Sequence, residues 1–261
     1  MERALLDKYE KLRQIIRDAG KVAVAYSGGV DSSLLLKAAV DAIGGDVIAL
    51  FAQSPLQFPG EAESVKELAR QIGSRLIICD LDPFQWDDFV SNPPDRCYHC
   101  KKRIYTLFLT KLSQEKEYSL VDGTNSDDLL TDRPGLKAIE ELGVLTPLTL
   151  AHLHKDEIRC LSRHFHLPTW DKPSSSCLAT RIPAGSEISR QKVEMVGQCE
   201  QYLHSLGFFG CRVRLEGDVA KIELAEGDIE RFAQRKIRDR VTTFFADMGL
   251  QKVFLDLAGR P

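Results

Sequence analysis

The sequence predicts an α/β protein, in which a parallel sheet covered by helices on both faces is followed by a smaller α+β domain. Over residues 1–165, short apolar runs alternate with segments of helical periodicity, a pattern typical of right-handed βαβ crossovers. The rest of the chain reads as helix, strand, strand, helix and strand, the order of a small open-faced sandwich. We place the boundary near residue 187, which gives domains of residues 1–186 and 187–261.

The first domain is expected to begin with a helix over residues 1–19, which carries one apolar face and ends at Gly20. Its expected strands are residues 22–26, 46–51, 75–79 and 118–121, and its further helices include residues 59–72 and 154–165. The second domain is expected to contain a helix at 189–206, a hairpin of 209–215 and 219–224, a mostly helical stretch at 228–248 and a last strand at 252–257.

The composition indicates a globular protein, with 43% hydrophobic and 28% charged residues. No apolar run approaches the roughly 20 residues that a membrane span requires, and Met1-Glu2-Arg3 leads into a helix rather than a signal peptide. We therefore expect a cytoplasmic protein. The net charge of −3 gives no overall attraction to nucleic acid. Seven cysteines in such a compartment favour reduced, metal-bound or catalytic thiols over a disulfide framework.

The stretch Ser27-Gly28-Gly29-Val30-Asp31-Ser32 lies between a buried strand and the start of a helix. Its two glycines allow positive φ and a close approach of backbone to a ligand. Its serines offer donors at a helix N-terminus, where the dipole favours an anion. A plain Gly-Gly turn is the alternative, but the placement favours phosphate binding. The stretch lacks the lysine of a Walker loop and the spacing of a dinucleotide fingerprint.

Ligands of parallel sheets lie beyond the carboxyl ends of the strands. Four stretches are expected to meet there, namely residues 27–32, 52–54, 80–82 and 122–128. The last of them opens the loop DGTNSDDLLTDRPG, residues 122–135. Its carboxylates and amides suit Mg²⁺ or ATP, whereas the alternative is a capped turn in which Asp127 or Asp128 opens a helix.

Cys97 and Cys100 have the C-x-x-C spacing of a metal or redox pair. A thioredoxin-like role is disfavoured because the pair follows Asn92-Pro93-Pro94-Asp95 instead of a strand. Cys177, in the polar, proline-rich loop of residues 168–186, is the best candidate for a third ligand. Three thiolates suit a [4Fe-4S] cluster with one open iron, while zinc would recruit a fourth ligand such as His99, and the spacing does not separate the two metals.

Three arginines lie where an anionic substrate would be held. Arg181 follows Cys177 by four residues, and Arg212 and Arg214 alternate along one strand and so face the same side. Guanidinium groups suit a substrate that carries phosphate or carboxylate. The alternative is a solvated strand face.

The phosphate loop resembles that of the PP-loop ATP pyrophosphatase superfamily. Together, SGGVDSSLL, RCYHCK, DGTNSDDLLTDRPG, SSSCLATRIP and the pair Arg212/Arg214 resemble the LarE family, sulfur transferases that help to make the nickel-pincer nucleotide cofactor of lactate racemase. The resemblance implies a PP-loop (adenine nucleotide α-hydrolase-like) domain, a small C-terminal domain and a homo-oligomer, typically a hexamer.

The reaction that this resemblance implies begins when ATP adenylates a carboxylate of pyridinium-3,5-biscarboxylic acid mononucleotide and releases pyrophosphate. Sulfur then replaces the activated oxygen. Some family members sacrifice the sulfur of a lone cysteine at the position of Cys177. This sequence departs from them, because Cys97 and Cys100 match the version in which a [4Fe-4S] cluster delivers the sulfur.

The resemblance also implies a role for each site residue, with ATP, Mg²⁺ and the cluster as cofactors. Asp31 and Cys177 are expected to be catalytic, and Cys97, Cys100 and Cys177 to bind the metal cluster. Asp127 or Asp128 is expected to aid Mg²⁺, and Glu200 and Glu223 to serve a metal or acid–base role. Cofactor and substrate binding are expected of Ser27, Gly28, Gly29, Asp31, Ser32, Ser33, Ala52, Gly123, Thr124, Asp127, Arg181, Arg212, Arg214, Glu200 and Glu223.

Two other functions stay open. A PP-loop tRNA thiolase would also use three cysteines and a cluster, but it predicts a basic surface, and the net charge of −3 argues against it. A regulatory protein that binds a nucleotide and structural zinc would release no pyrophosphate. The expected partner is therefore a small nucleotide substrate with carboxylates, without membrane or nucleic acid, in a homo-oligomer.

Overall fold

The computed structural model describes residues 3–113, 117–130, 133–173 and 176–260, and they form two compact units. The first unit comprises Met1–Ser54, Pro59–Asp82 and Asp95–Lys172, and the second comprises Pro55–Phe58, Pro83–Pro94 and Pro173–Pro261. The second unit thus begins before residue 187 and includes the loop of Cys177. Backbone hydrogen bonding explains this, because Leu178 N donates to Leu56 O at 3.1 Å.

The first unit is built on a four-stranded sheet in the order β3-β2-β1-β4, with every neighbouring pair parallel. Its strands are β1 (Lys21–Ala25), β2 (Val47–Gln53), β3 (Arg75–Asp80) and β4 (Tyr118–Asp122). The register places Val22 of β1 opposite Val47 of β2 and Lys21 opposite Tyr118 of β4. The prediction of an α/β fold with a parallel sheet is confirmed.

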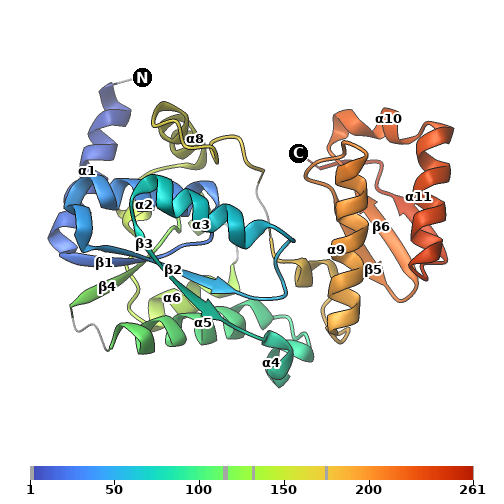
Figure 1. Ribbon diagram of the computed structural model, residues 1–261, viewed down its shortest axis with the longest axis horizontal. Helices are drawn as coiled ribbons and strands as arrows, with labels where there is room; N and C mark the ends of the chain where they lie inside the picture. Colours follow the sequence, from blue (N-terminus) through green and yellow to red (C-terminus); the bar gives the residue numbers. More distant parts are fainter. Residues whose placement is uncertain (1–2, 114–116, 131–132, 174–175, 261) are drawn as a thin grey trace. The chain divides into compact units, whose positions relative to one another are not determined.

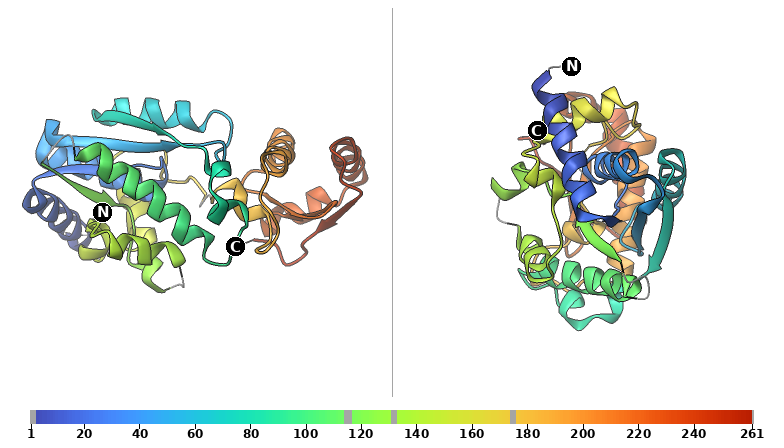
Figure 2. Two further views of the ribbon diagram at one scale, coloured as in Figure 1. Left: turned by 90° about the horizontal axis from the view of Figure 1, so that it is seen from below. Right: turned by 90° about the vertical axis from the view of Figure 1, so that its left-hand side faces the viewer.

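Helices cover both faces of this sheet, as Figures 1 and 2 show. Val22 and Val24 of β1 belong to the apolar cluster of one face, whereas Ala23 and Ala25 belong to that of the other, as the alternation of a strand requires. The first face packs against α1 (Arg3–Ala19), α2 (Val30–Ile43), α3 (Glu61–Ile72) and α8 (Lys155–His164). The second packs against α5 (Arg96–Leu112) and α6 (Pro134–Glu141).

The second unit contains a three-stranded sheet in the order β5-β6-β7, antiparallel between β5 and β6 and parallel between β6 and β7. Its elements are α9 (Arg190–Ser205), β5 (Arg212–Glu216), β6 (Val219–Glu223), α10 (Ile229–Phe232), α11 (Arg235–Asp247) and β7 (Lys252–Leu255). The buried face of β5 carries Val213 and Leu215, and α9 and α11 lie on one side of the sheet (Figure 2). Arg212 and Arg214 alternate with these residues and face the other side.

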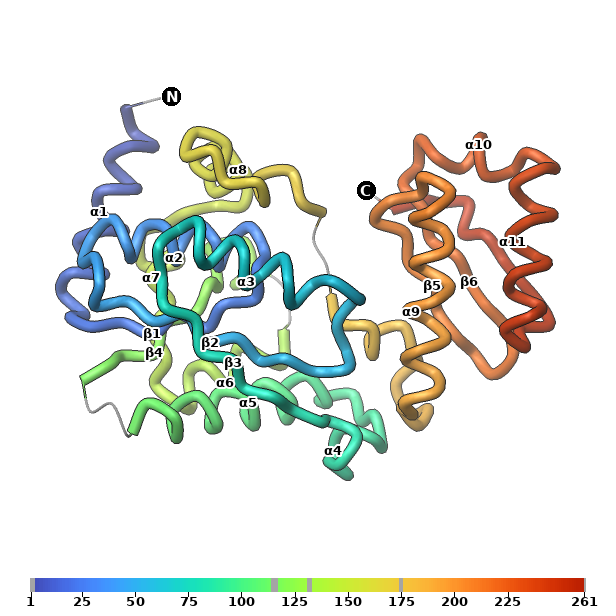
Figure 3. Tube along the Cα trace, viewed as in Figure 1, coloured from blue at the N-terminus to red at the C-terminus, as the bar shows by residue number. Residues whose placement is uncertain are grey.

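Two details of this unit go beyond or differ from the sequence prediction. The mostly helical stretch expected over residues 228–248 is divided into α10 and α11, because Gln234 adopts an extended backbone conformation. The strand expected from residue 209 begins at Arg212, because Gly210 takes a positive φ of 70° and turns the chain before β5. Figure 3 follows the trace from α9 through this turn into the hairpin.

Short one-turn helices complete the described part of the chain. They are α4 (Asp87–Val90), α7 (Pro147–Leu150) and the 3₁₀ helices η1 (Gly44–Asp46), η2 (Pro83–Gln85), η3 (Asp127–Leu130), η4 (Leu178–Arg181) and η5 (Glu226–Asp228). None of the helices in the described ranges combines the length and the apolar character that a membrane span needs.

Candidate functional site

The phosphate loop joins β1 to α2 and is shaped by its own serines. The hydroxyls of Ser27 and Ser32 lie 3.0 Å apart, and Gly29 N donates to Ser27 Oγ at 3.3 Å. Gly29 caps the N-terminus of α2 without a side-chain hydrogen bond. The first turn of α2, with the positive end of its dipole, therefore follows the loop directly, in the strand–turn–helix arrangement that the sequence predicted.

Two glycines let other segments approach this loop closely. At Gly28, where φ is +69°, an added Cβ would lie 2.6 Å from Val65 Cγ2. At Gly123, after β4, an added Cβ would lie 3.0 Å from Ser32 N. Ser33 is fully buried and its amide donates to Gly29 O at 3.0 Å. Gly28 thus allows close packing of the loop against Val65, and Gly123 allows close packing of the β4 loop against Ser32. Ser33 stabilises the loop through its hydrogen bond to Gly29.

Asp31, in the first turn of α2, is held by two partners from distant segments. Lys155 Nζ forms an ion pair with Asp31 Oδ2, and Asn125 Nδ2 donates to Asp31 Oδ1 at 3.1 Å. The side chains of Lys155 and Asp31 remain partly exposed. A carboxylate and an ammonium group therefore both lie at the phosphate loop, where one suits Mg²⁺ and the other suits phosphate oxygens.

The loop after β4 is ordered by side-chain hydrogen bonds. Asn125 Oδ1 accepts from the amides of Asp127 and Asp128 at 2.9 and 3.2 Å. Asp127 in turn accepts from His154 Nδ1 at 2.7 Å and from Lys155 N at 2.6 Å. These contacts, above all the one from His154, hold the pKa of the Asp127 carboxyl below its usual range. Asp127 therefore stays ionised at neutral pH, and the turn fixes it beside the start of α8.

Asp122 ends β4 and lies almost buried beneath this loop. Its carboxylate accepts hydrogen bonds from the hydroxyl of Tyr105 and from Thr124, the backbone amide of which lies 2.8 Å away. Lys101 Nζ, on α5, lies 3.5 Å from the same carboxylate. Burial is the largest cause that raises the pKa of Tyr105 well above its usual value. Because Thr124 bonds to the nearly buried Asp122, its side chain points into the protein. Ala52, another predicted site residue, lies near the end of β2.

The cysteine pair lies at the start of α5 in the first unit. Cys97 is exposed and Cys100 is half-buried, and the i, i+3 spacing places both thiols on one face of the helix. Cys97 Sγ lies 3.7 Å from Arg96 Nη2. Two accessible thiols with this spacing suit a soft metal. Within the described ranges, no group of three or more Cys, His, Asp or Glu side chains is gathered for a metal ion.

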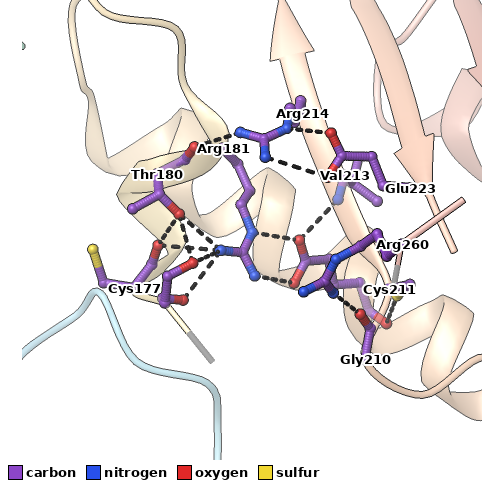
Figure 4. A network of polar contacts seen from close by, with 11 residues as sticks. Cys177, Thr180, Arg181, Gly210, Cys211, Val213, Arg214, Glu223 and Arg260 are labelled. Atoms are coloured by element: carbon purple, nitrogen blue, oxygen red, sulfur yellow. Dashed lines mark hydrogen bonds and ion pairs between the residues drawn. The ribbon is translucent and has the colours of Figure 1, made fainter. Parts of the chain in front are cut away.

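Cys177 lies in the second unit, exposed, directly before η4. Its carbonyl accepts from Thr180 N at 3.0 Å and from Thr180 Oγ1 at 2.8 Å. Arg181 Nη1 donates to Ser176 Oγ at 2.7 Å and to Thr180 Oγ1 at 2.8 Å. These bonds, drawn in Figure 4, hold the backbone around the thiol.

Arg181 is fastened from the other side by Glu200 of α9. Arg181 Nε and Nη2 donate to the two carboxylate oxygens of Glu200 at 2.8 and 3.1 Å, and the side chains are 3% and 0% exposed. Val213 N donates to Glu200 Oε1 at 2.8 Å. Replacing only one partner of such a buried ion pair strongly destabilises a protein, because the other charge is left buried without a partner.

Arg214 and Glu223 form a second pair across the β5–β6 hairpin. Arg214 Nε lies 2.5 Å from Glu223 Oε1 and Nη2 lies 3.3 Å from Oε2. Arg214 Nη1 also donates to Thr180 O at 3.1 Å, which ties the arginine strand to the loop of Cys177 (Figure 4). Arg212 lies directly opposite Glu223 in the register.

The structure brings in four residues that sequence reasoning did not assign to the site. Lys155 and Asn125 contact Asp31, Lys101 contacts Asp122, and Arg260 lies at the end of the β5–β6 hairpin. Asn125 lies inside the loop of residues 122–135, and Lys101 follows Cys100 directly. Their position next to predicted site residues could therefore have indicated them. Lys155 and Arg260 carry no such signal, because their partners are distant in sequence.

Comparison with known proteins places the chain among PP-loop proteins. It is 38% identical to an uncharacterized protein of Synechocystis, over 98% of this chain and 95% of that protein. It is 35% identical to the pyridinium-3,5-bisthiocarboxylic acid mononucleotide synthase of Lactiplantibacillus plantarum, over 98% and 92%. It is also 28% identical to one component of the glutamine-hydrolyzing GMP synthase of Archaeoglobus fulgidus, over 75% and 68%.

No family model matches the chain, so the assignment depends on these whole-chain similarities. The two most similar of these relatives cover nearly the whole of this chain and are themselves covered almost end to end. The similarity to the GMP synthase component is consistent with the parallel sheet and phosphate loop of the first unit. The chain therefore belongs to the LarE family of PP-loop proteins, the family of the pyridinium-3,5-bisthiocarboxylic acid mononucleotide synthase.

Proposed function

We propose that this protein is an ATP-dependent sulfur transferase of nickel-pincer nucleotide biosynthesis. Its substrate is pyridinium-3,5-biscarboxylic acid mononucleotide, one carboxylate of which is adenylated and then exchanges oxygen for sulfur. The name of the Lactiplantibacillus plantarum relative supports this substrate class. The phosphate loop and the arginine strand of this chain supply the two anion-binding surfaces that such a reaction requires.

The first half of the reaction gives the carboxylate a leaving group. Displacement of oxide from an unactivated carboxylate is too difficult, so the carboxylate is activated first. A carboxylate oxygen attacks the α-phosphorus of ATP, and the bond from this phosphorus to pyrophosphate breaks. The start of α2 would bind the phosphates, and Asp31 would hold a Mg²⁺ that neutralises their charge. Lys155, the partner of Asp31 in the structure, is well placed to bind the departing pyrophosphate.

The second half delivers sulfur, after which AMP leaves. Cys97, Cys100 and Cys177 would hold a [4Fe-4S] cluster, for which three accessible thiols are a suitable donor set. When bound, the cluster would supply the sulfur atom. Arg181 and Thr180 hold the backbone of Cys177 in place.

The observation that carries the proposal is the hydrogen bond between Arg214 of β5 and Thr180 of η4. It joins a strand with two arginines to the loop that presents Cys177, within one unit. A sulfur-handling cysteine beside guanidinium groups suits a substrate that is both anionic and destined to receive sulfur.

Anaerobic purification followed by iron, sulfide and zinc analysis tests the sulfur half. We expect roughly four iron and four sulfide per chain, lost in Cys97→Ala, Cys100→Ala and Cys177→Ala. Cys160→Ala is the matched control, since Cys160 is also exposed but has no proposed role. Zinc in place of iron, or iron retained in all three variants, would contradict a cluster at these residues.

Turnover with ATP, Mg²⁺ and the mononucleotide tests the whole proposal. We expect AMP and pyrophosphate in equal amounts, with a thiocarboxylate product detected by mass spectrometry. ATP binding without pyrophosphate release would point to a non-catalytic nucleotide-binding protein. Sulfur transfer to tRNA but not to the mononucleotide would show a tRNA thiolase.

A further inference from the structure

Two glutamates of the second unit each neutralise one arginine. Glu200 pairs with Arg181, and both carboxylate oxygens of Glu223 are engaged by Arg214. Neither glutamate is therefore available as the main partner of a further arginine. Ion pairing of this kind fixes side-chain geometry but leaves no net charge for a ligand.

Two more arginines, Arg212 and Arg260, lie at the same end of the β5–β6 hairpin. Within the residues that the structure describes, neither forms an ion pair, and Arg212 forms no side-chain hydrogen bond. Arg212 is half-buried at the start of β5, opposite a glutamate that Arg214 already occupies. The group of four arginines and two glutamates thus carries two positive charges in excess.

The backbone of Arg260, the last residue that the structure describes, holds this residue in place. Its amide donates to Leu224 O at 2.7 Å, and it forms a parallel bridge with Ala225, two residues after the end of β6. Gly259 permits this return, because an added Cβ would lie 3.0 Å from Glu226 Cα and its φ is +71°. The backbone of Arg260 is thus held beside the end of β6, close to where β5 begins.

The guanidinium of Arg260 reaches the turn that leads into β5. Arg260 Nη1 contacts Gly210 O, which precedes Arg212 by two residues, as Figure 4 shows. Burial is the largest cause that lowers the pKa of Arg212, and the positive charges of Arg260 and Arg181 follow it. An anion bound here would relieve both the repulsion and part of the desolvation.

We propose that Arg212 and Arg260 together bind the phosphate dianion of the mononucleotide substrate, while Arg181 and Arg214 position the loop of Cys177. Two guanidinium groups with no carboxylate partner match the charge of a phosphate monoester and its bidentate geometry. The identity of the mononucleotide rests on the proposed function, whereas the phosphate site rests on the contacts of this unit.

Binding of nicotinamide mononucleotide, compared with its phosphate-free nucleoside, tests the site by calorimetry. Nicotinamide mononucleotide carries a ribose phosphate on a pyridinium ring, as the proposed substrate does. We expect the wild-type protein to prefer the mononucleotide by about ten- to a hundredfold, the range of charge-assisted hydrogen bonds. We expect Arg212→Gln and Arg260→Gln each to lose most of this preference, and Arg260→Lys to recover part of it.

Arg238→Gln is the matched control, because Arg238 is exposed on α11 and the same charge is removed there. It should leave the preference unchanged, as should binding of ATP in every variant. Thermal unfolding of each variant shows whether it is folded. A folded Arg260→Gln protein that keeps the full preference would overturn the inference, as would a wild-type protein with no preference.

Turnover separates this inference from the proposed function. If both hold, Arg260→Gln raises KM for the mononucleotide about ten- to a hundredfold with kcat little changed. If the wild-type protein makes no thiocarboxylate but still binds the mononucleotide through Arg212 and Arg260, the proposed function fails and the phosphate site stands.

Discussion

At the scale of single residues, the phosphate loop and Arg181 differ in how far their contacts follow from the local sequence. The residue types of the phosphate loop predict an anion site, because glycines and serines at a strand–helix junction act through their own backbone. Arg181 is different. Its type and spacing suggested a substrate clamp, but the partner that occupies two of its nitrogens, Glu200, lies nineteen residues away on α9. No local pattern reports such a pair.

Gly28 provides a sharp residue-scale prediction. Gly28→Ala should lower the free energy of unfolding by more than the roughly 1 kcal/mol that a positive φ costs, because the new Cβ would meet Val65 at 2.6 Å. The displaced loop should bind ATP at least tenfold more weakly. Urea denaturation and ATP titration measure the two effects.

Gly20→Ala is the control for this change. Gly20 has a similar φ of +74°, but an added Cβ would meet nothing within 4 Å. It should therefore pay the conformational cost of about 1 kcal/mol and keep the ATP affinity of the wild-type protein. Equal losses of ATP affinity in the two variants would refute a specific role for the contact between Gly28 and Val65.

At the scale of elements, the strands were predicted well because buried parallel strands read as short apolar runs. The stretch of residues 228–248 was predicted as mostly helical, but the position of the break between α10 and α11 was not predictable, because the extended backbone of Gln234 has no sequence signal such as proline. The role of α5 was also only partly visible. Its cysteines were recognised from their spacing, whereas the contact from Lys101 to β4 depends on the packing of the helix against the sheet.

Lys101→Met tests whether this contact fixes α5 at the carboxyl edge of the sheet. Lys101 Nζ lies 3.5 Å from the nearly buried Asp122 carboxylate, so its loss should lower the free energy of unfolding by about 1–2 kcal/mol. Lys102→Met is the neighbouring control, because Lys102 pairs with Glu141 at the surface, where such pairs contribute about 0–1 kcal/mol.

Chemical denaturation gives the stabilities, and hydrogen exchange shows whether the amides of α5 open more readily in Lys101→Met. If Lys102→Met destabilises the protein as much as Lys101→Met, the two pairs are equivalent and the anchoring of α5 by Lys101 is wrong. The comparison is independent of any metal, since neither lysine is a proposed ligand.

At the scale of the whole molecule, the order of elements in each unit was predictable, but the interleaving of the units was not. Residues 55–58 and 83–94 belong with the second unit. Their assignment depends on contacts such as that of Asn92, whose Nδ2 donates to Pro183 O at 2.6 Å and to Ser186 O at 2.9 Å. Such tertiary partners are invisible in a short polar segment.

The reactivity of the cysteines should report on the opening of the second unit. Burial is the main cause that raises the pKa of both Cys199 and Cys211 to about 12. An unfolded chain loses these protons near pH 9, whereas the folded unit keeps them. Stability should therefore be unaffected well below pH 9 and fall as the pH rises from about 9 towards 12.

Alkylation with iodoacetamide followed by peptide mass spectrometry measures this. Exposed Cys160 should react in the native protein, while Cys199 and Cys211 should react only in urea or as the pH approaches 12. Rapid alkylation of Cys199 at pH 8 in the folded protein would contradict the burial that the structure shows.

The interleaving of the two units limits how this protein can be divided or re-engineered. The chain passes from one unit to the other five times, the last time at Pro173. A gene fragment that encodes residues 187–261 would lack Val90, whose carbonyl accepts a hydrogen bond from Ile188 N at 2.9 Å. The second unit is therefore not one continuous segment that recombination could transfer to another protein.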